Sequence, residues 1–361
     1  MIPLSRRVVH LASGREWRGG QNQVLLLARA LAAGPHPVEQ IVITGAGSVL
    51  AQRLEDAGIP VRPAGWRAGL SPTALVATLR EISRRPALLH AHDAHALTLA
   101  GLAAGLTDTP FVVTRRVDFH LRRRGFWSRA NRVIAISGAV RAVLVADGIE
   151  PGRITTVPSG IDLAAVRSVR AGALREALGL PATGPLAVAV GALVNHKDHA
   201  TLIDAAVALR ARRPDLNWAI AGEGALRGAL EAQLARCGMA DRVHLLGHLN
   251  EPLRLIASAD VFVMSSQTEG LGTSVLDAMA LDVPIAATRA GGIPELLHDG
   301  AGLLSPPGDG VALADSVDQL LGNASLRAAV VRQAQSRVEK FSADTMAEGV
   351  LATYRSALGE C

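Results

Sequence analysis

The chain contains few cysteines and few aromatic residues. Its 361 residues include two cysteines, Cys237 and Cys361, which are too few and too far apart for a disulfide framework or a zinc site. Aromatic residues make up 3% of the chain, so its hydrophobic cores must be built from alanine, valine, leucine and isoleucine. Because bases need aromatic rings to stack on, and no nucleic-acid-binding module is recognisable, we expect no nucleic-acid partner.

Long apolar segments are absent as well. No apolar run approaches the roughly 20 residues that a helix needs to cross a bilayer. The segment Met1–Arg7 has no apolar stretch followed by small residues, as a secretory signal would. Together with the scarcity of cysteine, this predicts a protein of the cytoplasm, which is a reducing compartment.

Lysine is scarce too. The formal net charge of +5 is carried almost entirely by arginine, and Lys197 and Lys340 are the only lysines. Seven arginines lie between Arg115 and Arg132, against the single acid Asp118. Two interpretations of this segment stay open. It is either the solvated face of an arginine-rich protein, or a platform for a phosphorylated glycan or an anionic membrane surface, on which the protein would be peripheral.

What the chain does have is a regular alternation of short apolar runs and helical patterns. The expected strands are Arg7–Ala12, Gln40–Thr44, Val61–Ala64, Leu88–His92, Phe111–Thr114, Arg132–Ile136, Ile154–Val157, Pro185–Val190, Asn217–Ala221, Arg242–Leu246, Asp260–Met264, Pro284–Ala287 and Gly302–Leu304. Apolar strands joined by crossover helices favour parallel sheets that are buried on both faces. We therefore expect an α/β protein with two doubly wound, Rossmann-like domains, 1–162 and 163–341, and a final helix over 342–361 that packs back on the first domain. A single helical stretch is expected from Leu163 to Leu180, and Ser342 is the expected N-cap of the final helix.

The most informative segment runs from Glu269 to Asp277. It follows the expected strand Asp260–Met264 and leads into an expected helix over Val275–Leu281. A turn of small residues between a strand and a helix leaves backbone amides free to bind an anion at the helix end. Because a carboxylate stands on each side of this turn, the pattern favours a phosphate that carries a hydroxyl-rich group at each end, as in a nucleotide-sugar.

Lys197 stands at a second junction of this kind. It closes the segment Gly191-Ala-Leu-Val-Asn-His-Lys197, which follows the strand Pro185–Val190 and precedes a helical pattern that starts at Asp198. The carboxyl ends of parallel strands meet at one edge of a sheet, where ligands bind. In a chain so poor in lysine, a compact cation at this place favours a bound phosphate over a merely solvated side chain.

The histidines of His90-Ala-His92-Asp93-Ala-His95 form a further polar cluster. Alternation along a strand places His90 and His92 on one face, as metal ligands often are. No matching distant set of histidines or cysteines is evident, so we do not favour a metal site. We expect instead that His92 and Asp93 lie at the carboxyl end of the strand, with Asp93 orienting a ring nitrogen of His92; a histidine that is simply packed in a strand is the alternative.

These segments resemble the GT4 family of retaining glycosyltransferases, whose GT-B fold has two Rossmann-like domains that face each other across a cleft. The resemblance is carried by Ser265–Ala280, Pro284–Glu295, Val190–Lys197, Val157–Asp162 and Arg132–Ser137. It implies transfer of a sugar from a nucleotide-diphosphate sugar to a glycan or lipid-linked acceptor, in the synthesis of a cell-envelope polysaccharide or lipopolysaccharide. It implies no metal and no other cofactor.

The resemblance and the motifs together give each candidate residue an expected role. At the catalytic centre we expect Lys197, Glu269, His92, Asp93 and Arg116. For the donor we expect Gly20, Gly191, Lys197, Glu223, Gly270, Leu271, Gly272, Thr273, Ser274 and Asp277, and for the acceptor Glu16, Arg18, Gln21 and Arg115. By resemblance, Glu269 would bind sugar hydroxyls, Lys197 would neutralise the departing diphosphate and Asp277 would bind the ribose.

The sequence departs from the family pattern at four places. Ala192 replaces the arginine of the phosphate loop, Ser159 replaces an interdomain asparagine, and Asp277 replaces the usual glutamate. Arg115 or Arg116 replaces a histidine that contacts the sugar. A non-catalytic binder of nucleotide-sugars and a GT-B epimerase or phosphorylase therefore remain as alternatives. A dinucleotide-dependent oxidoreductase is disfavoured, because no G-x-G-x-x-G follows the first strand.

Overall fold

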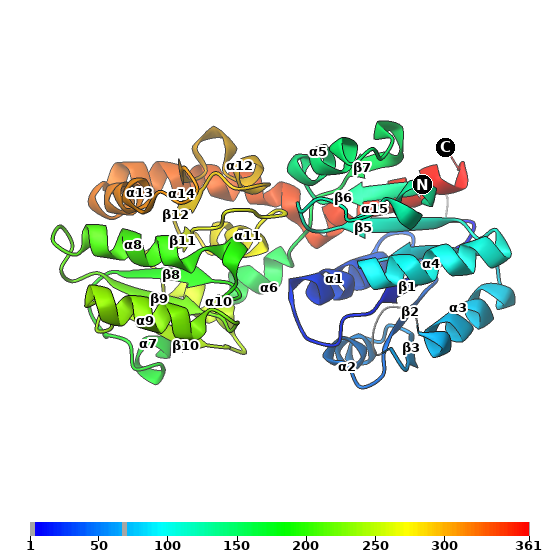
Figure 1. Ribbon diagram of the computed structural model, residues 1–361, viewed down its shortest axis with the longest axis horizontal. Helices are drawn as coiled ribbons and strands as arrows, with labels where there is room; N and C mark the ends of the chain where they lie inside the picture. The colour runs from blue at the N-terminus through cyan, green and yellow to red at the C-terminus, as the bar shows by residue number, and fades with distance from the viewer. Residues whose placement is uncertain (1–3, 67–70, 361) are drawn as a thin grey trace. The chain divides into compact units, whose positions relative to one another are not determined.

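The computed structural model describes residues 4–66 and 71–360, and the chain separates into two compact units (Figure 1). Unit 1 runs to Ile161 and resumes at Phe341, whereas unit 2 spans Asp162–Lys340. Residues 1–3 and Cys361, which entered the arguments on a leader segment and on cysteine content, lie outside the described residues.

Unit 1 is built around a parallel sheet of seven strands in the order β3-β2-β1-β4-β5-β6-β7. The strands are β1 Arg7–Ala12, β2 Gln40–Gly45, β3 Val61–Ala64, β4 Ala87–Ala91, β5 Phe111–Arg115, β6 Arg132–Ala135 and β7 Ile154–Thr156. The helices are α1 Gly19–Ala33, α2 Val49–Asp56, α3 Pro72–Arg84, α4 Ala94–Thr107, α5 Gly138–Ala146 and α15 Ala343–Leu358, with short 3-10 turns at η1 Gly125–Arg129 and η2 Pro151–Arg153. The strand residues Val8, Val9 and Leu11 are completely buried, as strands covered on both faces must be.

The final helix, α15, belongs to unit 1 although it follows unit 2 in the sequence (Figure 1, red). Ser342 caps it by accepting a hydrogen bond from the amide of Thr345 at 3.0 Å. Its residues Met346, Val350 and Tyr354 pack in the same core as Val8 of β1. The predicted N-cap and extent of this helix are therefore confirmed.

Unit 2 is built around a parallel sheet of six strands in the order β10-β9-β8-β11-β12-β13. The strands are β8 Leu186–Val190, β9 Asn217–Ala221, β10 Val243–Gly247, β11 Val261–Met264, β12 Ile285–Thr288 and β13 Leu303–Ser305. The helices are α6 Leu163–Ser168, α7 Leu174–Ala177, α8 His199–Leu209, α9 Arg227–Cys237, α10 Pro252–Ala257, α11 Thr273–Ala280, α12 Ile293–Leu296, α13 Gly310–Gly322 and α14 Ala324–Val338, with 3-10 turns at η3 Asn195–Lys197, η4 His298–Gly300 and η5 Glu339–Phe341. Trp218 of β9 is the largest side chain that is fully buried in this core.

The strand order of each sheet reverses at one point, between β1 and β4 in unit 1 and between β8 and β11 in unit 2. At such a switch point the connections leave in opposite directions and open a crevice at the carboxyl ends of the two strands, where ligands of doubly wound sheets bind. The segments that begin at Ser13 and His92 leave this edge of the first sheet, and those that begin at Gly191 and Ser265 leave the same edge of the second.

The predicted fold class is confirmed: both sheets are parallel and doubly wound. All thirteen expected strands are present in the described part of the chain, with ends that differ by a residue at most. The single helix expected over Leu163–Leu180 is wrong. It splits into α6 and α7, because Val169 is extended and Gly172 takes a left-handed φ of 57°. Among the described residues, no helix is long and apolar enough to cross a membrane.

Candidate active site

The turn between β11 and α11 presents backbone amides that have no partner in the part of the chain that the structure describes. Gly272 caps α11 in a left-handed conformation, with φ 95° and ψ 66°, and no side chain supplies the missing capping bond. The amides of Gly272, Thr273 and Ser274 donate no hydrogen bond to any described residue. Their donors and the positive end of the helix dipole together form an anion site. Glycine is needed at the cap because an L side chain is strained at this φ.

Lys197 lies at the edge of this turn. It ends the short turn η3 after β8, and its Nζ forms an ion pair with the Glu269 carboxylate. Both side chains are largely withdrawn from solvent, with 18% of Lys197 and 15% of Glu269 exposed. The Glu269 Cγ also lies 3.6 Å from the place where a Cβ on Gly272 would stand. The structure thus brings the lysine, the carboxylate and the open amides to one spot in unit 2.

Backbone and side-chain bonds hold the two loops together. The Ser265 hydroxyl donates to the carbonyl of Lys197 at 3.0 Å, and the backbone amide of Gln267 donates to the carbonyl of His196 at 2.8 Å. Of the other residues expected at the donor, Gly191 lies 3.6 Å (measured from a built Cβ) from the Lys197 Cδ. Glu223 accepts a hydrogen bond from Arg227 at 3.1 Å. The loops therefore form one packed surface around Lys197.

His199 is a neighbour of this site that the sequence analysis missed. It begins α8, is 4% exposed, and its Nε2 lies 3.9 Å from a Cβ built on Gly191. Burial, reinforced by the charge of Lys197, lowers the pKa of His199 to about 4, so its ring is neutral at neutral pH. The only signal in the sequence is its position two residues after the lysine, at the start of the helix.

Asp277 lies one turn inside α11. Its side chain is partly buried, and its carboxyl makes no hydrogen bond or ion pair with any residue that the structure describes, whereas its backbone carbonyl accepts from the amide of Leu281 at 3.1 Å. Burial raises the pKa of its carboxyl from 3.8 to about 7. A carboxyl that lacks an internal partner retains all of its acceptor capacity for a ligand. Its predicted contact with a ribose stays a prediction.

Asp277→Asn is expected to stabilise the protein in a pH-dependent way. Because the pKa of about 7 in the folded state lies above the ordinary 3.8, the folded protein holds this proton more tightly than the unfolded chain. The contribution of the Asp277 carboxyl to the free energy of unfolding is therefore fully present below pH 4, where the carboxyl is protonated in both states. It is lost as the pH rises through 7. Thermal melts should show a higher Tm for Asp277→Asn at pH 8 and little difference near pH 4. Asp215→Asn, at an exposed carboxylate, is the control, and an equal gain at both pH values would contradict the assignment.

In unit 1, the loop between β1 and α1 and the first turn of α1 carry three of the residues expected at the acceptor. Glu16 and Arg18 form an ion pair with each other, at 73% and 75% exposure. Gln21 lies across Gly14, because a Cβ added there would stand 1.9 Å from the Gln21 Nε2. Gly20 is the second residue of α1 and lies within van der Waals reach of Arg116, whose Cδ is 3.9 Å from a Cβ built on Gly20. The loop is therefore packed at its glycines and exposed at its charged residues.

Asp93 does not orient His92 as expected. It caps α4, accepting from the amide of Ala96 at 2.9 Å, and it also accepts from the amide and hydroxyl of Ser13 at 2.7 and 2.6 Å. As an N-cap it turns back toward the helix amides and away from the preceding histidine. His92 instead contacts His10 through Nε2 at 3.0 Å and Arg116 through Nδ1 at 3.3 Å. That prediction is wrong.

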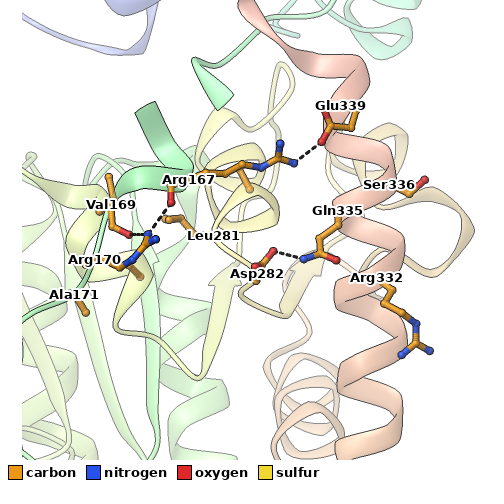
Figure 2. A pocket seen from close by; sticks show the side chains of 12 residues that line it. Arg167, Val169, Arg170, Ala171, Leu281, Asp282, Arg332, Gln335, Ser336 and Glu339 are labelled. Atoms are coloured by element: carbon orange, nitrogen blue, oxygen red, sulfur yellow. Dashed lines mark hydrogen bonds and ion pairs between the residues drawn. The ribbon is translucent and has the colours of Figure 1, made fainter. Parts of the chain in front are cut away.

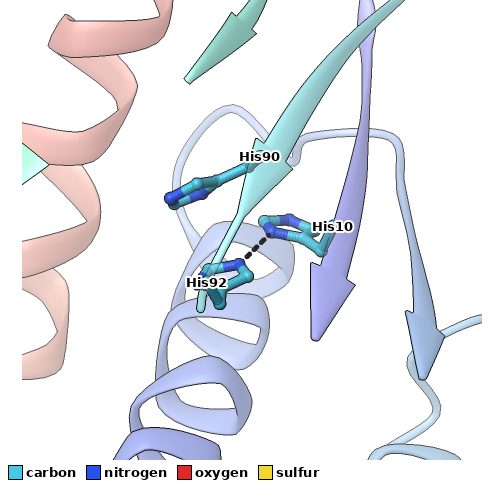
Figure 3. Close-up of side chains that lie close together, drawn as sticks. All are labelled: His10, His90 and His92. Atoms are coloured by element: carbon cyan, nitrogen blue, oxygen red, sulfur yellow. Dashed lines mark hydrogen bonds between the residues drawn. The ribbon is translucent and has the colours of Figure 1, made fainter. Parts of the chain in front are cut away.

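The imidazoles of His10 in β1, His90 in β4 and His92 just beyond the end of β4 lie close together (Figure 3). Their ring nitrogens lie within 4.8 Å of one another, as in a possible metal site. Both nitrogens of His90, however, are already engaged, with the Tyr354 hydroxyl at 2.6 Å and the Thr114 hydroxyl at 2.7 Å. With a guanidinium beside His92 as well, the cluster fits a hydrogen-bonded network better than a cation site, and we keep the expectation of no metal as a prediction.

Arg115 does not point freely into solvent. Its guanidinium donates to the carbonyls of Val117, at 3.0 Å, and Phe119, and lies 5.4 Å from the centre of the Trp127 ring. These contacts hold the segment after β5 in place. The acceptor role expected for Arg115 would require it to exchange these carbonyls for a ligand.

A separate hollow of about 950 Å³ lies elsewhere in unit 2 (Figure 2). It is lined by Arg167, Val169, Arg170, Ala171, Ala257, Ala280, Leu281, Asp282, Arg332, Gln335, Ser336 and Glu339. Its polar groups satisfy one another in part, since Arg167 pairs with Glu339 and Gln335 donates to Asp282 at 2.6 Å. None of the residues expected at the active site lines it, so it is distinct from the turn at Gly272.

Comparison with known proteins agrees with this geometry. The model "Glycosyltransferase Family 4" matches residues 17–165, and the model "Glycosyl transferases group 1" matches residues 172–337. The chain belongs to the family 4 glycosyltransferases. The two matches fall on unit 1 and unit 2 respectively and together span most of the chain.

Several curated glycosyltransferases are similar to this chain. The D-inositol 3-phosphate glycosyltransferase of Acidothermus cellulolyticus is 30% identical over 247 residues, which are 65% of this chain and 52% of that protein. The lipopolysaccharide core biosynthesis glycosyltransferase LpsE of Rhizobium meliloti is 31% identical over 179 residues, 49% of this chain and 52% of that protein. The chain thus spans about half the length of these curated relatives.

The solved structure of Anabaena HepE, in complex with UDP and glucose, is similar to the whole chain. It is 21% identical, covers 96% of this chain and 99% of its own, and superposes with a TM-score of 0.86. This likeness shows the GT-B fold. It agrees with the two parallel sheets of this family 4 member.

Proposed function

We propose that this chain is a retaining glycosyltransferase that moves a sugar from a nucleotide-diphosphate sugar to a glycan or lipid-linked acceptor of the cell envelope. Family membership supports the reaction class. The names of similar proteins, which include a lipopolysaccharide core glycosyltransferase and a D-inositol 3-phosphate glycosyltransferase, support an acceptor of that kind. A UDP-sugar donor is supported by the similar fold of HepE, whose structure contains UDP and glucose.

The observation that carries the proposal is the ion pair of Lys197 and Glu269 beside the open amides of Gly272, Thr273 and Ser274. Sugar transfer breaks the bond between the anomeric carbon and the diphosphate oxygen, and negative charge grows on the diphosphate. Preorganised amides and a cation stabilise that charge more than they stabilise the bound donor. A diphosphate would take over Lys197, and the Glu269 carboxylate would then accept from sugar hydroxyls.

The remaining steps follow from the proposed chemistry of the family. The acceptor oxygen forms a bond to the anomeric carbon on the face that the diphosphate leaves, and the acceptor proton passes to a donor phosphate oxygen. No separate protein nucleophile is then required. Asp277 would accept from the ribose. Glu16 and Arg18 on the first loop of unit 1, with Gln21 in the first turn of α1, would contact the acceptor.

A panel of nucleotide-sugars that differ in base and sugar tests the function. Thermal shift identifies the donors that bind, and nucleotide release is then measured with and without glycan and lipid-linked acceptors. Release that depends on an acceptor supports a transferase, whereas binding without any release supports the non-catalytic alternative. A protein that binds no nucleotide-sugar at all would contradict the proposal.

We further propose that the arginine-rich segment after β5 contacts an anionic membrane surface, at which a lipid-linked acceptor would be met. Arg122, Arg123 and Arg124 are exposed, and they follow the exposed apolar residues Val117 and Phe119, at 38% and 44% exposure. A basic cluster beside exposed apolar side chains is typical of peripheral binding to anionic lipids. This would place the protein on the inner face of the cell membrane.

Changing Arg122, Arg123 and Arg124 to glutamine is expected to weaken binding to vesicles that contain anionic lipid by about 10²-fold, at about 1 kcal/mol per basic residue. Vesicle sedimentation at two salt concentrations measures this, and the difference should shrink at high salt. The control replaces Arg210, Arg236 and Arg332, three exposed arginines of unit 2, and changes the net charge equally. Equal losses of vesicle binding in both triple variants would show that this segment is only a solvated face of the protein.

A further inference from the structure

Arg116 is a withdrawn cation that forms no ion pair with a carboxylate of the described residues, although the charge of Asp93 acts on it from a distance. It follows β5, its stem lies beside Gly20, and its Nε is buried with no hydrogen-bond partner among the described residues. Burial lowers the pKa of Arg116 to about 10, so the guanidinium keeps its charge at neutral pH. The one side-chain contact of its guanidinium that the structure gives is Nη2 to the Nδ1 of His92, at 3.3 Å.

This contact fixes the direction of a chain of hydrogen bonds. An arginine can only donate, so the Nδ1 of His92 must accept and carries no proton. The proton of the neutral His92 ring is therefore on Nε2, which donates to the Nδ1 of His10 at 3.0 Å (Figure 3). His10 then carries its own proton on Nε2. Burial lowers the pKa of both rings, of His10 to about 4, so neither is charged.

The His10 end of this series of hydrogen bonds has no partner among the described residues. The Nε2 of His10 and the Oε1 of Gln40 are buried, and neither has a hydrogen-bond partner in the described residues. The Gln40 side chain lies near enough to the His10 ring to oppose the effect of burial on its pKa. An unmade bond of this kind destabilises the folded protein. If the protons of His10 and His92 both moved to Nδ1, the Nε2 of His10 would still have no partner in the described residues. The Nδ1–H of His92 would then point at the guanidinium of Arg116. The Arg116 end therefore decides the arrangement.

His90 prevents His92 from turning away. The centres of the two rings are 3.9 Å apart. The nitrogens of His90 are held by Thr114 and by Tyr354 of α15, so His90 is itself fixed. His92 thus stands between a fixed ring on one side, His10 on a second and Arg116 on the third. All of these contacts lie within unit 1.

We propose that His92 is a positioning residue, supported from behind by His10, that holds the guanidinium of Arg116 at the Gly20 turn for an anionic group of the substrate. The inference rests on the proposed function, which supplies that group as a phosphate oxygen. The single tautomer of His92 distinguishes this role from simple packing, because packing alone requires neither a particular proton position nor an acceptor facing Arg116.

The tautomer can be measured without any substrate. In protein labelled with ¹⁵N-histidine, imidazole nitrogen shifts at pH 7.5 should show His92 protonated on Nε2 and unprotonated on Nδ1, with the signals assigned by their loss in His92→Asn. In Arg116→Ala, which removes the one donor to Nδ1 among residues 4–66 and 71–360, the ring should become a mixture of tautomers. A His92 that carries its proton on Nδ1, or that is unchanged in Arg116→Ala, overturns the proposal even if the enzyme transfers sugar as proposed.

Kinetics give the second test. Arg116→Ala should lower kcat/KM by about 10²-fold, and His92→Leu, which keeps the bulk and loses the acceptor, by about tenfold. His92→Asn should recover part of that loss, because its amide oxygen lies where Nδ1 does. The double variant should be no worse than Arg116→Ala alone, since both changes act through one guanidinium. Losses that multiply, or no recovery in His92→Asn, count against the positioning of Arg116 by His92. A failure of the proposed function appears instead as no nucleotide release in the wild type.

Discussion

Lys197→Ala is expected to lower kcat for nucleotide release in the presence of acceptor by about 10²–10³-fold, the range for loss of one preorganised charge at a departing anion. The reason is that Lys197 is the side-chain cation paired with Glu269 beside the open amides of α11. The arginine that the family places in the phosphate loop is Ala192 here, so that loop supplies no second charge. Stability should fall much less, because the lysine serves a ligand and is not part of the core.

Three variants make this result specific. Lys340→Ala removes the only other lysine of the sequence and should leave kcat near the wild-type value. Lys197→Ala leaves the Glu269 carboxylate, 15% exposed, without its cation, so Lys197→Ala combined with Glu269→Gln separates that stability cost from the loss of catalysis. Lys197→Arg restores charge with a different shape and should recover part of kcat. Parallel losses of Tm and kcat in Lys197→Ala would argue that the residue is structural.

The sheets could be predicted from the sequence because their physical cause is local. Strands of parallel sheets are buried on both faces, so they appear as short apolar runs, and the run Val261–Met264 is fully buried in the structure as its composition requires. The turn at Gly272 could be predicted for the same reason. A strand, small residues and a helix pattern follow one another directly, and the φ of 95° is one that glycine adopts readily.

The network around Arg116 could not be predicted, because it depends on register between distant strands. His10 in β1 lies opposite His90 in β4 only because the two strands pair in parallel with that register. Nothing near His10 in the sequence marks it as a partner of His92. The wrong expectation for Asp93 has a related cause. A residue after a strand can face the ligand or cap the next helix. The hydrogen bonds that Asp93 accepts from Ser13 and Ala96 show that it caps α4.

Gly222→Ala is expected to have the largest effect on stability, with a loss of about 3 kcal/mol, near the upper end for inserting a methyl group into close packing. Gly222 follows β9, and a Cβ added there would stand 1.9 Å from the carbonyl oxygen of Gly191 and 2.8 Å from its carbonyl carbon. Both clashes are with backbone, so no side chain can rotate away. The Gly191 amide meanwhile donates to Ala221 at 3.0 Å and ties the same two loops together.

Relief of this clash would have to separate the loop that carries Lys197 from the end of β9, so donor affinity should fall together with Tm. A loss of about 3 kcal/mol corresponds to roughly 10 °C in a unit of this size. Gly228→Ala is the matched control, because Gly228 lies in α9 and the new Cβ would meet no described atom within 4 Å outside its chain neighbours and the backbone of that helix. Alanine should stabilise the helix by up to about 1 kcal/mol. If both variants melted alike, the backbone around Gly191 would be free to yield, and the anion site would lack the rigidity on which stabilisation of a departing diphosphate depends.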